Sequence, residues 1–110
     1  LMITPDELGY RIVALERYLQ ANPHFSRRGE LEQVYRYYLP AYLLGLNNTP
    51  AFSYQTNRLE ASFLQSYRST VIKYRGTKFA RLVQAYLSVL AKNDYHRTKQ
   101  VLDFAAKAGA

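Results

Sequence analysis

Apolar residues recur every three or four positions along most of this 110-residue chain, and this spacing constrains the fold more than any other feature. Such a repeat places apolar side chains on one face of an α-helix. No segment shows the sustained alternation of a half-buried strand, so we expect no strands. Only 5 glycines and 4 prolines punctuate the chain, which is too few for the closely spaced turns of an all-β sandwich or barrel.

The first helix has a clear predicted start and end. Thr4 and Glu7 have the spacing of a capping box, in which the threonine hydroxyl accepts the Glu7 amide and the glutamate reaches back. Pro5 occupies the first helical position, where its missing N–H costs nothing. Asn22 and Pro23 then predict the end of this helix.

The second helix is predicted to begin near Ser26 and to continue its apolar pattern to Leu46. Pro40 falls inside that pattern, and a proline removes one backbone hydrogen bond and clashes with the preceding turn. We therefore expect this helix to be kinked or broken at Pro40. Residues 47–50 predict a turn, and Thr49-Pro50 has the form of a start to another helical piece.

The second half predicts three more helices. One spans about residues 57–75 and ends at Gly76 in a left-handed cap. Thr77 is the predicted cap of the next, and Asp94 the predicted cap of the last, after a turn at Asn93. The fold class that follows is all-α, a compact bundle of about five helices joined by short turns.

Length and composition predict where such a bundle belongs. The whole chain, residues 1–110, fits a single domain. The longest charge-free stretch, residues 37–57, contains prolines and amide side chains, so it does not predict a transmembrane helix. The N-terminus lacks a basic start followed by an apolar run, so no signal peptide is expected. Cysteine is absent, which excludes disulfides and fits a cytoplasmic protein.

Charge is distributed unevenly. Residues 1–57 form a near-neutral half with five basic and five acidic side chains, and residues 58–110 form a basic half that carries the entire net charge of +7. Between residues 61 and 93 no acidic residue occurs. One-sided charge of this kind favours an anionic partner, although simple solubility would also account for it.

The strongest candidate site surrounds the predicted start of the fourth helix. Cations are concentrated there, although a helix N-terminus favours acidic residues. Free N–H groups, a threonine hydroxyl and a flexible Gly76 would suit a phosphate or carboxylate. The alternative is that the long side chains extend into water, or that Arg75 reaches the end of the preceding helix. The predicted nucleic-acid or anion-binding residues are Arg68, Lys73, Arg75, Thr77, Lys78 and Arg81.

Tyrosine is frequent, with 11 in the chain. Tyr67, Tyr74 and Tyr86 lie among the basic residues, where exposed rings could stack on unpaired bases, but their spacing favours the core. A second cluster lies in the charge-free stretch and makes its helix apolar on more than one side, which indicates central burial or a protein interface. The predicted interface residues are Tyr35, Tyr37, Tyr38, Tyr42 and Leu44.

Catalysis is poorly supported by the sequence. The two histidines, His24 and His96, fall on separate predicted elements, and neither has a metal-ligand spacing or a nearby cysteine. No phosphate-binding glycine loop or nucleophile elbow occurs. We therefore expect no enzyme, no metal and no cofactor.

The function that the sequence favours is a non-catalytic domain contacting nucleic-acid phosphates through its basic half, without sequence specificity. The alternative is a protein-interaction or assembly module. Its tyrosine- and leucine-rich surface would bind a partner or form a homo-oligomer, and its basic face would bind an acidic protein segment. A membrane-surface helix is less favoured, because the apolar positions of the fourth helix are needed for the core.

Overall fold

Five helices and one short hairpin make up the regular structure in the computed structural model, which describes residues 3–109. The helices are α1 (Pro5–Ala21), α2 (Arg28–Leu44), α3 (Ala61–Lys73), α4 (Lys78–Lys92) and α5 (Lys99–Ala108). The hairpin pairs β1 (Gly45–Leu46) with β2 (Thr49–Pro50) in antiparallel register. The predicted all-α bundle of about five helices is confirmed.

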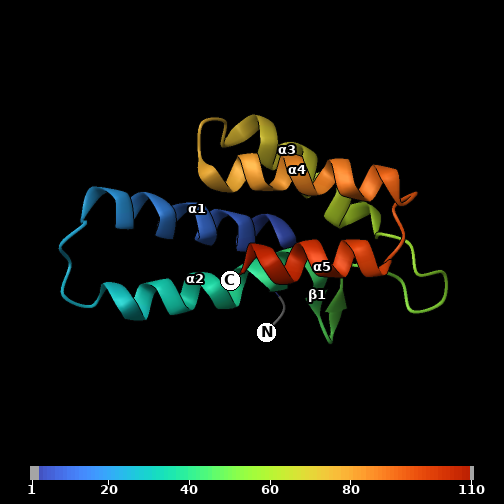
Figure 1. Ribbon diagram of the computed structural model, residues 1–110, viewed down its shortest axis with the longest axis horizontal. Coiled ribbons are helices and arrows are strands. Elements are labelled where there is room, and N and C mark those ends of the chain that lie inside the picture. Colours follow the sequence, from blue (N-terminus) through green and yellow to red (C-terminus); the bar gives the residue numbers. More distant parts are fainter. Residues whose placement is uncertain (1–2, 110) are drawn as a thin grey trace.

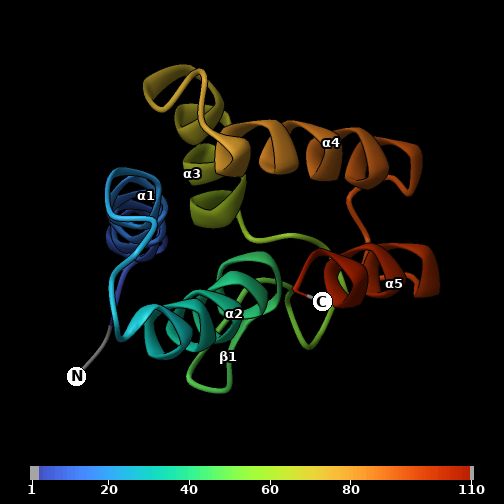
Figure 2. The ribbon, with the colours of Figure 1, turned by 60° about the vertical axis from the view of Figure 1, so that its left-hand side comes forward.

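The helices form a closed ring around one core. α1 packs on α2, α2 on α5, α5 on α4, α4 on α3, and α3 returns to α1 (Figures 1 and 2). Each helix turns its apolar stripe inward, which is what the spacing of three and four predicts. Within residues 3–109, no helix combines the length and apolar character needed to cross a bilayer.

Local signals placed most helix ends correctly. The Thr4 Oγ1 accepts the Glu7 amide at 3.1 Å, and the Thr77 Oγ1 accepts the Ala80 amide at 3.0 Å. α1 ends at Ala21 with Asn22 as its C-cap. α3 ends at Lys73 with Tyr74 as its C-cap, two residues before the predicted end. Gly76 follows in the turn at φ +93°, the left-handed conformation that glycine adopts without steric cost.

The expected break at Pro40 does not occur: α2 runs through the proline, and buried side chains on both sides of it hold the helix against its neighbours. The expectation of no strands is wrong, because Thr49-Pro50 forms β2 rather than a helical piece. Gly45 makes the hairpin possible, since its φ is +84° and a Cβ there would overlap the Ala51 nitrogen.

Two helices begin later along the chain than the sequence predicted. α3 begins at Ala61 rather than near residue 57. α5 begins at Lys99, and its cap is Thr98, whose Oγ1 accepts the Val101 amide at 3.3 Å. Asp94 is not the cap; it lies in the preceding turn at φ 54°. The Thr98 hydroxyl in turn donates to the Asn93 Oδ1 at 2.9 Å, so the cap is held by the turn itself.

Two buried tyrosines link the core to the C-terminus of α2. The Tyr67 hydroxyl donates to the Tyr42 carbonyl at 2.8 Å and to the Leu43 carbonyl at 3.0 Å. The Tyr86 hydroxyl donates to the same Leu43 carbonyl at 2.7 Å. These carbonyls belong to the last turn, where a helix leaves its C=O groups without internal partners. The hydroxyls therefore cap α2 from α3 and α4, and the predicted core positions of Tyr67 and Tyr86 are confirmed.

Candidate functional site

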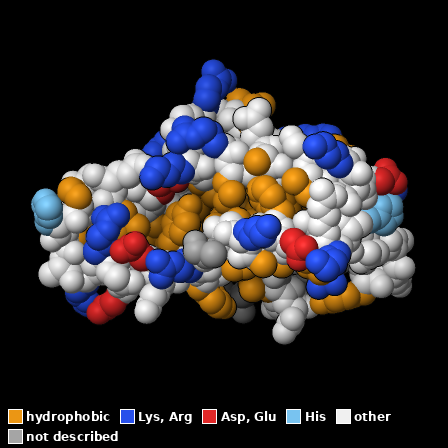
Figure 3. Space-filling model, in the orientation of Figure 1, with side chains coloured by type: hydrophobic (Ala, Val, Ile, Leu, Met, Phe, Trp, Pro, Cys, Tyr) orange, Lys and Arg blue, Asp and Glu red, His pale blue; other side chains and the backbone are white. Residues whose placement is uncertain are grey.

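Four of the predicted cations lie together at the turn between α3 and α4. Lys73 is the last residue of α3, Arg75 lies in the turn, and Lys78 and Arg81 lie in the first turn of α4. All four side chains are exposed. We call these four residues the basic turn. Figure 3 shows Lys and Arg side chains gathered over this part of the molecule. Arg68, also exposed, lies farther back along α3.

None of these cations forms an ion pair with a carboxylate of the described residues. Arg81 makes one internal contact, in which its Nη1 donates to the Gly76 carbonyl at 3.2 Å. Lys73 places its Nζ 5.5 Å from the centre of the Tyr74 ring, within the range of a cation–π contact. The basic turn therefore keeps most of its charge available to solvent or to an anionic partner.

Arg17 joins this surface from α1. Its guanidinium carbon lies 6.0 Å from the centre of the Tyr74 ring, on which Lys73 also lies. Tyr74 itself is only 8% exposed, so it belongs to the core as predicted and contributes only its ring face and edge here. No local pattern predicts Arg17 at this surface, because it is far from the basic turn along the chain.

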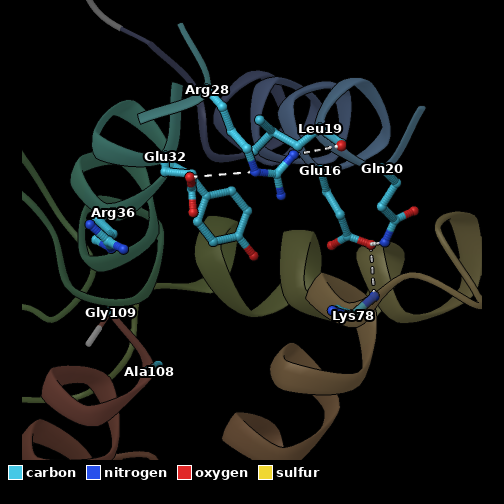
Figure 4. Close-up of a pocket in the computed structure, with 10 residues that line it drawn as sticks. Glu16, Leu19, Gln20, Arg28, Glu32, Arg36, Lys78, Ala108 and Gly109 are labelled. Atoms are coloured by element: carbon cyan, nitrogen blue, oxygen red, sulfur yellow. Dashed lines mark hydrogen bonds and ion pairs between the residues drawn. The ribbon is translucent and has the colours of Figure 1, made fainter. Parts of the chain in front are cut away.

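The start of α4 is already occupied by a carboxylate of the same chain. Glu16, on α1 and only 7% exposed, accepts the Lys78 amide on Oε2 at 2.9 Å (Figure 4). Its Oε1 accepts the Phe79 amide, also at 2.9 Å. The expectation that an external anion would use these N–H groups is therefore wrong. Thr77 is 8% exposed and donates to the Tyr74 carbonyl at 2.8 Å, so its role is structural capping.

The predicted protein-interface residues differ in how far the fold exposes them. Tyr42 is fully buried, with its hydroxyl 2.9 Å from the Ser66 Oγ and 2.8 Å from the Thr70 Oγ1. Burial raises the pKa of Tyr42 to about 12 despite these two hydrogen bonds. Tyr37 is 67% exposed. The three others, Tyr35, Tyr38 and Leu44, are half-buried.

An exposed apolar patch lies on the outer face of α1 and α2. We call it the tyrosine patch. Two adjoining grooves of about 490 Å³ and 350 Å³ run along it and share Arg11 and Tyr38 as lining residues. The Arg11 Nη1 donates to the Tyr38 hydroxyl at 3.3 Å where the grooves meet. The exposed residues of the patch are Tyr10, Tyr18, Val34 and Tyr37.

The histidines lie far from each other. His24 is in the connection between α1 and α2, and His96 is in the connection between α4 and α5, which lie at opposite ends of the molecule (Figure 1). His96 Nδ1 is 3.8 Å from the Asp94 Oδ2, and Arg58 approaches the same oxygen at 3.9 Å. Among residues 3–109, no three His, Asp or Glu side chains are grouped so as to hold a metal ion.

Comparison of the chain with protein-family models, with curated proteins and with solved structures finds no match. Function is therefore inferred from the geometry of these surfaces.

Proposed function

We propose that this chain binds nucleic-acid phosphates through the basic turn, without sequence specificity and without catalysing a reaction. The observation that carries the proposal is the group of exposed cations at the α3–α4 turn, with no carboxylate of residues 3–109 paired to them. Lys and Arg contacts to phosphate supply most of the affinity of nonspecific binding. The four side chains come from two helix ends and a turn, so no single helix is presented for reading base edges.

The Glu16 cap favours a polyanion over a single phosphate ion. A free phosphate binds best where several backbone N–H groups at a helix start point at it, and here Glu16 accepts the Lys78 and Phe79 N–H groups. The remaining positive charge is carried by long, separately anchored side chains. Such side chains suit a chain of spaced phosphates, which gains affinity by releasing counterions at each contact.

Removing charge from the basic turn tests this proposal. The triple variant Arg75→Gln/Lys78→Gln/Arg81→Gln should lose most of its affinity for a labelled single strand in fluorescence anisotropy. Because each phosphate contact contributes about 0.7 to the salt dependence on a single strand, the slope of log K against log salt should become shallower by about 2. Duplex binding should fall in parallel.

A charge-matched control distinguishes binding at the basic turn from general attraction to the net positive charge of the protein. Arg36, Lys92 and Lys107 are exposed cations outside the basic turn, so Arg36→Gln/Lys92→Gln/Lys107→Gln lowers the net charge equally. This control should keep most of the affinity. Equal losses in both triple variants, or binding by the wild-type protein that does not weaken with salt, would contradict the proposal.

The tyrosine patch favours a second candidate function, a protein-interaction module that binds a second copy of the chain. Tyr10 and Tyr37 are 63% and 67% exposed on adjoining grooves, and exposed aromatic clusters are typical of protein interfaces. The patch lies on α1 and α2, in the half with balanced charge. Two copies can therefore meet there without opposing their basic halves.

Sedimentation equilibrium over a concentration series tests this second candidate. We expect reversible dimers, and we expect Tyr10→Asp/Tyr37→Asp to raise the dimer dissociation constant by about tenfold or more, because charges are depleted from interface cores. Tyr54→Asp is the matched control, since Tyr54 is 80% exposed and does not line either groove. A wild-type mass of one chain at every concentration would exclude the homodimer.

A further inference from the structure

A cleft of about 250 Å³ opens where α1, α2, α4 and the end of α5 meet. Figure 3 shows hydrophobic side chains at the bottom of a hollow in this face, and Figure 4 shows the lining residues from all four helices. Its apolar lining comes from Leu19 on α1, Ala108 on α5 and the ring of Tyr35 on α2. We call it the central cleft.

The acidic groups of the central cleft are already engaged. Both oxygens of Glu16 accept N–H groups at the start of α4, and its Oε2 also accepts from the Gln20 amide at 3.5 Å. Glu32 lies 3.5 Å from the Arg28 Nε, and the Arg28 Nη1 donates to the Leu19 carbonyl at 2.8 Å. Glu16 is therefore satisfied by N–H groups, and Glu32 is paired with Arg28.

Three polar groups of the cleft have no such partner. Arg36 and Lys78 line it from α2 and α4, on different sides of the view in Figure 4, and neither pairs with a described carboxylate. The Tyr35 hydroxyl donates to no described residue. Burial, and then the nearby Glu16 carboxylate, raise the pKa of Tyr35, so at neutral pH the hydroxyl is a neutral donor. Each of these three groups can donate a hydrogen bond, and two of them are cations.

We propose that the central cleft binds a small carboxylate with an apolar body, such as a short aliphatic or aromatic acid. Arg36 and Lys78 would hold the carboxylate, to which a guanidinium donates two parallel hydrogen bonds. The Tyr35 ring, Leu19 and Ala108 would cover the apolar body. A volume of about 250 Å³ is below the roughly 300–1,000 Å³ of pockets for drug-sized ligands, so the ligand has about ten non-hydrogen atoms.

Titration of the ¹⁵N-labelled protein with four probes tests this site. Hexanoate and benzoate should shift the amide resonances of Leu19, Lys78 and Gly109 saturably, with dissociation constants of about 1 mM. Hexanol lacks the charge and inorganic phosphate lacks the apolar body, so each should bind about tenfold more weakly than hexanoate. Shifts that do not saturate, or equal affinity for hexanol or phosphate, would overturn the proposal.

Arg36→Gln should weaken hexanoate binding about fivefold or more, because it removes the bidentate donor. Lys107→Gln makes the same change in charge on an exposed residue that does not line the cleft, and it should leave the affinity within about twofold. Equal effects of the two variants would also overturn the site. Arg36 lies outside the basic turn, so this result is independent of nucleic-acid binding.

Discussion

Replacing Glu16 by alanine is expected to lower the free energy of unfolding by about 3 kcal/mol, because hydrogen bonds to a charged group contribute about 1.5–3 kcal/mol each and the Phe79 amide left behind is buried. The Glu16 carboxylate accepts both the Lys78 and the Phe79 amides at 2.9 Å. Phe79 is fully buried, so its N–H has no ready access to water in the variant. The loss also removes a negative charge from a helix N-terminus, where it is stabilising.

Two further variants make this prediction specific, and urea denaturation measures all three. Glu16→Gln keeps the shape but offers one acceptor oxygen, so its loss of stability should be about half as large. Glu30→Ala removes a carboxylate that pairs with Arg27 at 2.7 Å on an exposed surface, and should change stability by about 0.5 kcal/mol or less. If Glu16→Ala were no more destabilising than Glu30→Ala, the carboxylate would not be holding α1 against α4.

The sequence was sufficient to predict the helix caps and turns that depend on residues only a few positions apart. Thr4 and Thr77 cap helices because each hydroxyl accepts an amide N–H three residues ahead, and Gly76 turns the chain after α3 because of its own conformational freedom. The inward faces of the helices follow from spacing alone. The grouping of Lys73, Arg75 and Lys78 was also local, since neighbours along the chain cannot lie far apart.

Contacts between residues far apart along the chain could not be predicted from the sequence. Glu16 caps a helix that begins 62 residues later, and no pattern around either residue indicates that pairing. The same is true of Arg17 beside Tyr74, and of the central cleft, to which four helices contribute. Pro40 does not break α2, because tertiary packing holds the helix on both sides of the proline. In each case the deciding contact depends on how the helices are arranged.

The buried tyrosines predict that the protein unfolds cooperatively in alkali, between about pH 10 and pH 12. Burial raises the pKa of Tyr42 to about 12, and it raises the pKa values of Tyr67 and Tyr86 as well. An unfolded tyrosine ionises near pH 10, so the unfolded chain releases these protons first. The contribution to stability is therefore complete below about pH 10 and is lost as the pH rises, by about 1.4 kcal/mol per pH unit for each tyrosine.

Three such tyrosines together lower stability by about 4 kcal/mol per pH unit, against a total of about 5–15 kcal/mol for a typical domain. Circular dichroism should therefore lose its helical signal together with the rise in phenolate absorbance.

Tyr86→Phe removes the 2.7 Å hydrogen bond to the Leu43 carbonyl, so the variant should be less stable by about 1–2 kcal/mol at neutral pH. Above about pH 10, the stability of this variant should nevertheless fall less steeply than that of the wild type. The two slopes should differ by about 1.4 kcal/mol per pH unit, because one titrating hydroxyl is gone. Tyr37→Phe, at an exposed position, should change neither quantity. Complete ionisation of all tyrosines while the helices stay intact would show that the hydroxyls capping α2 are not held away from water.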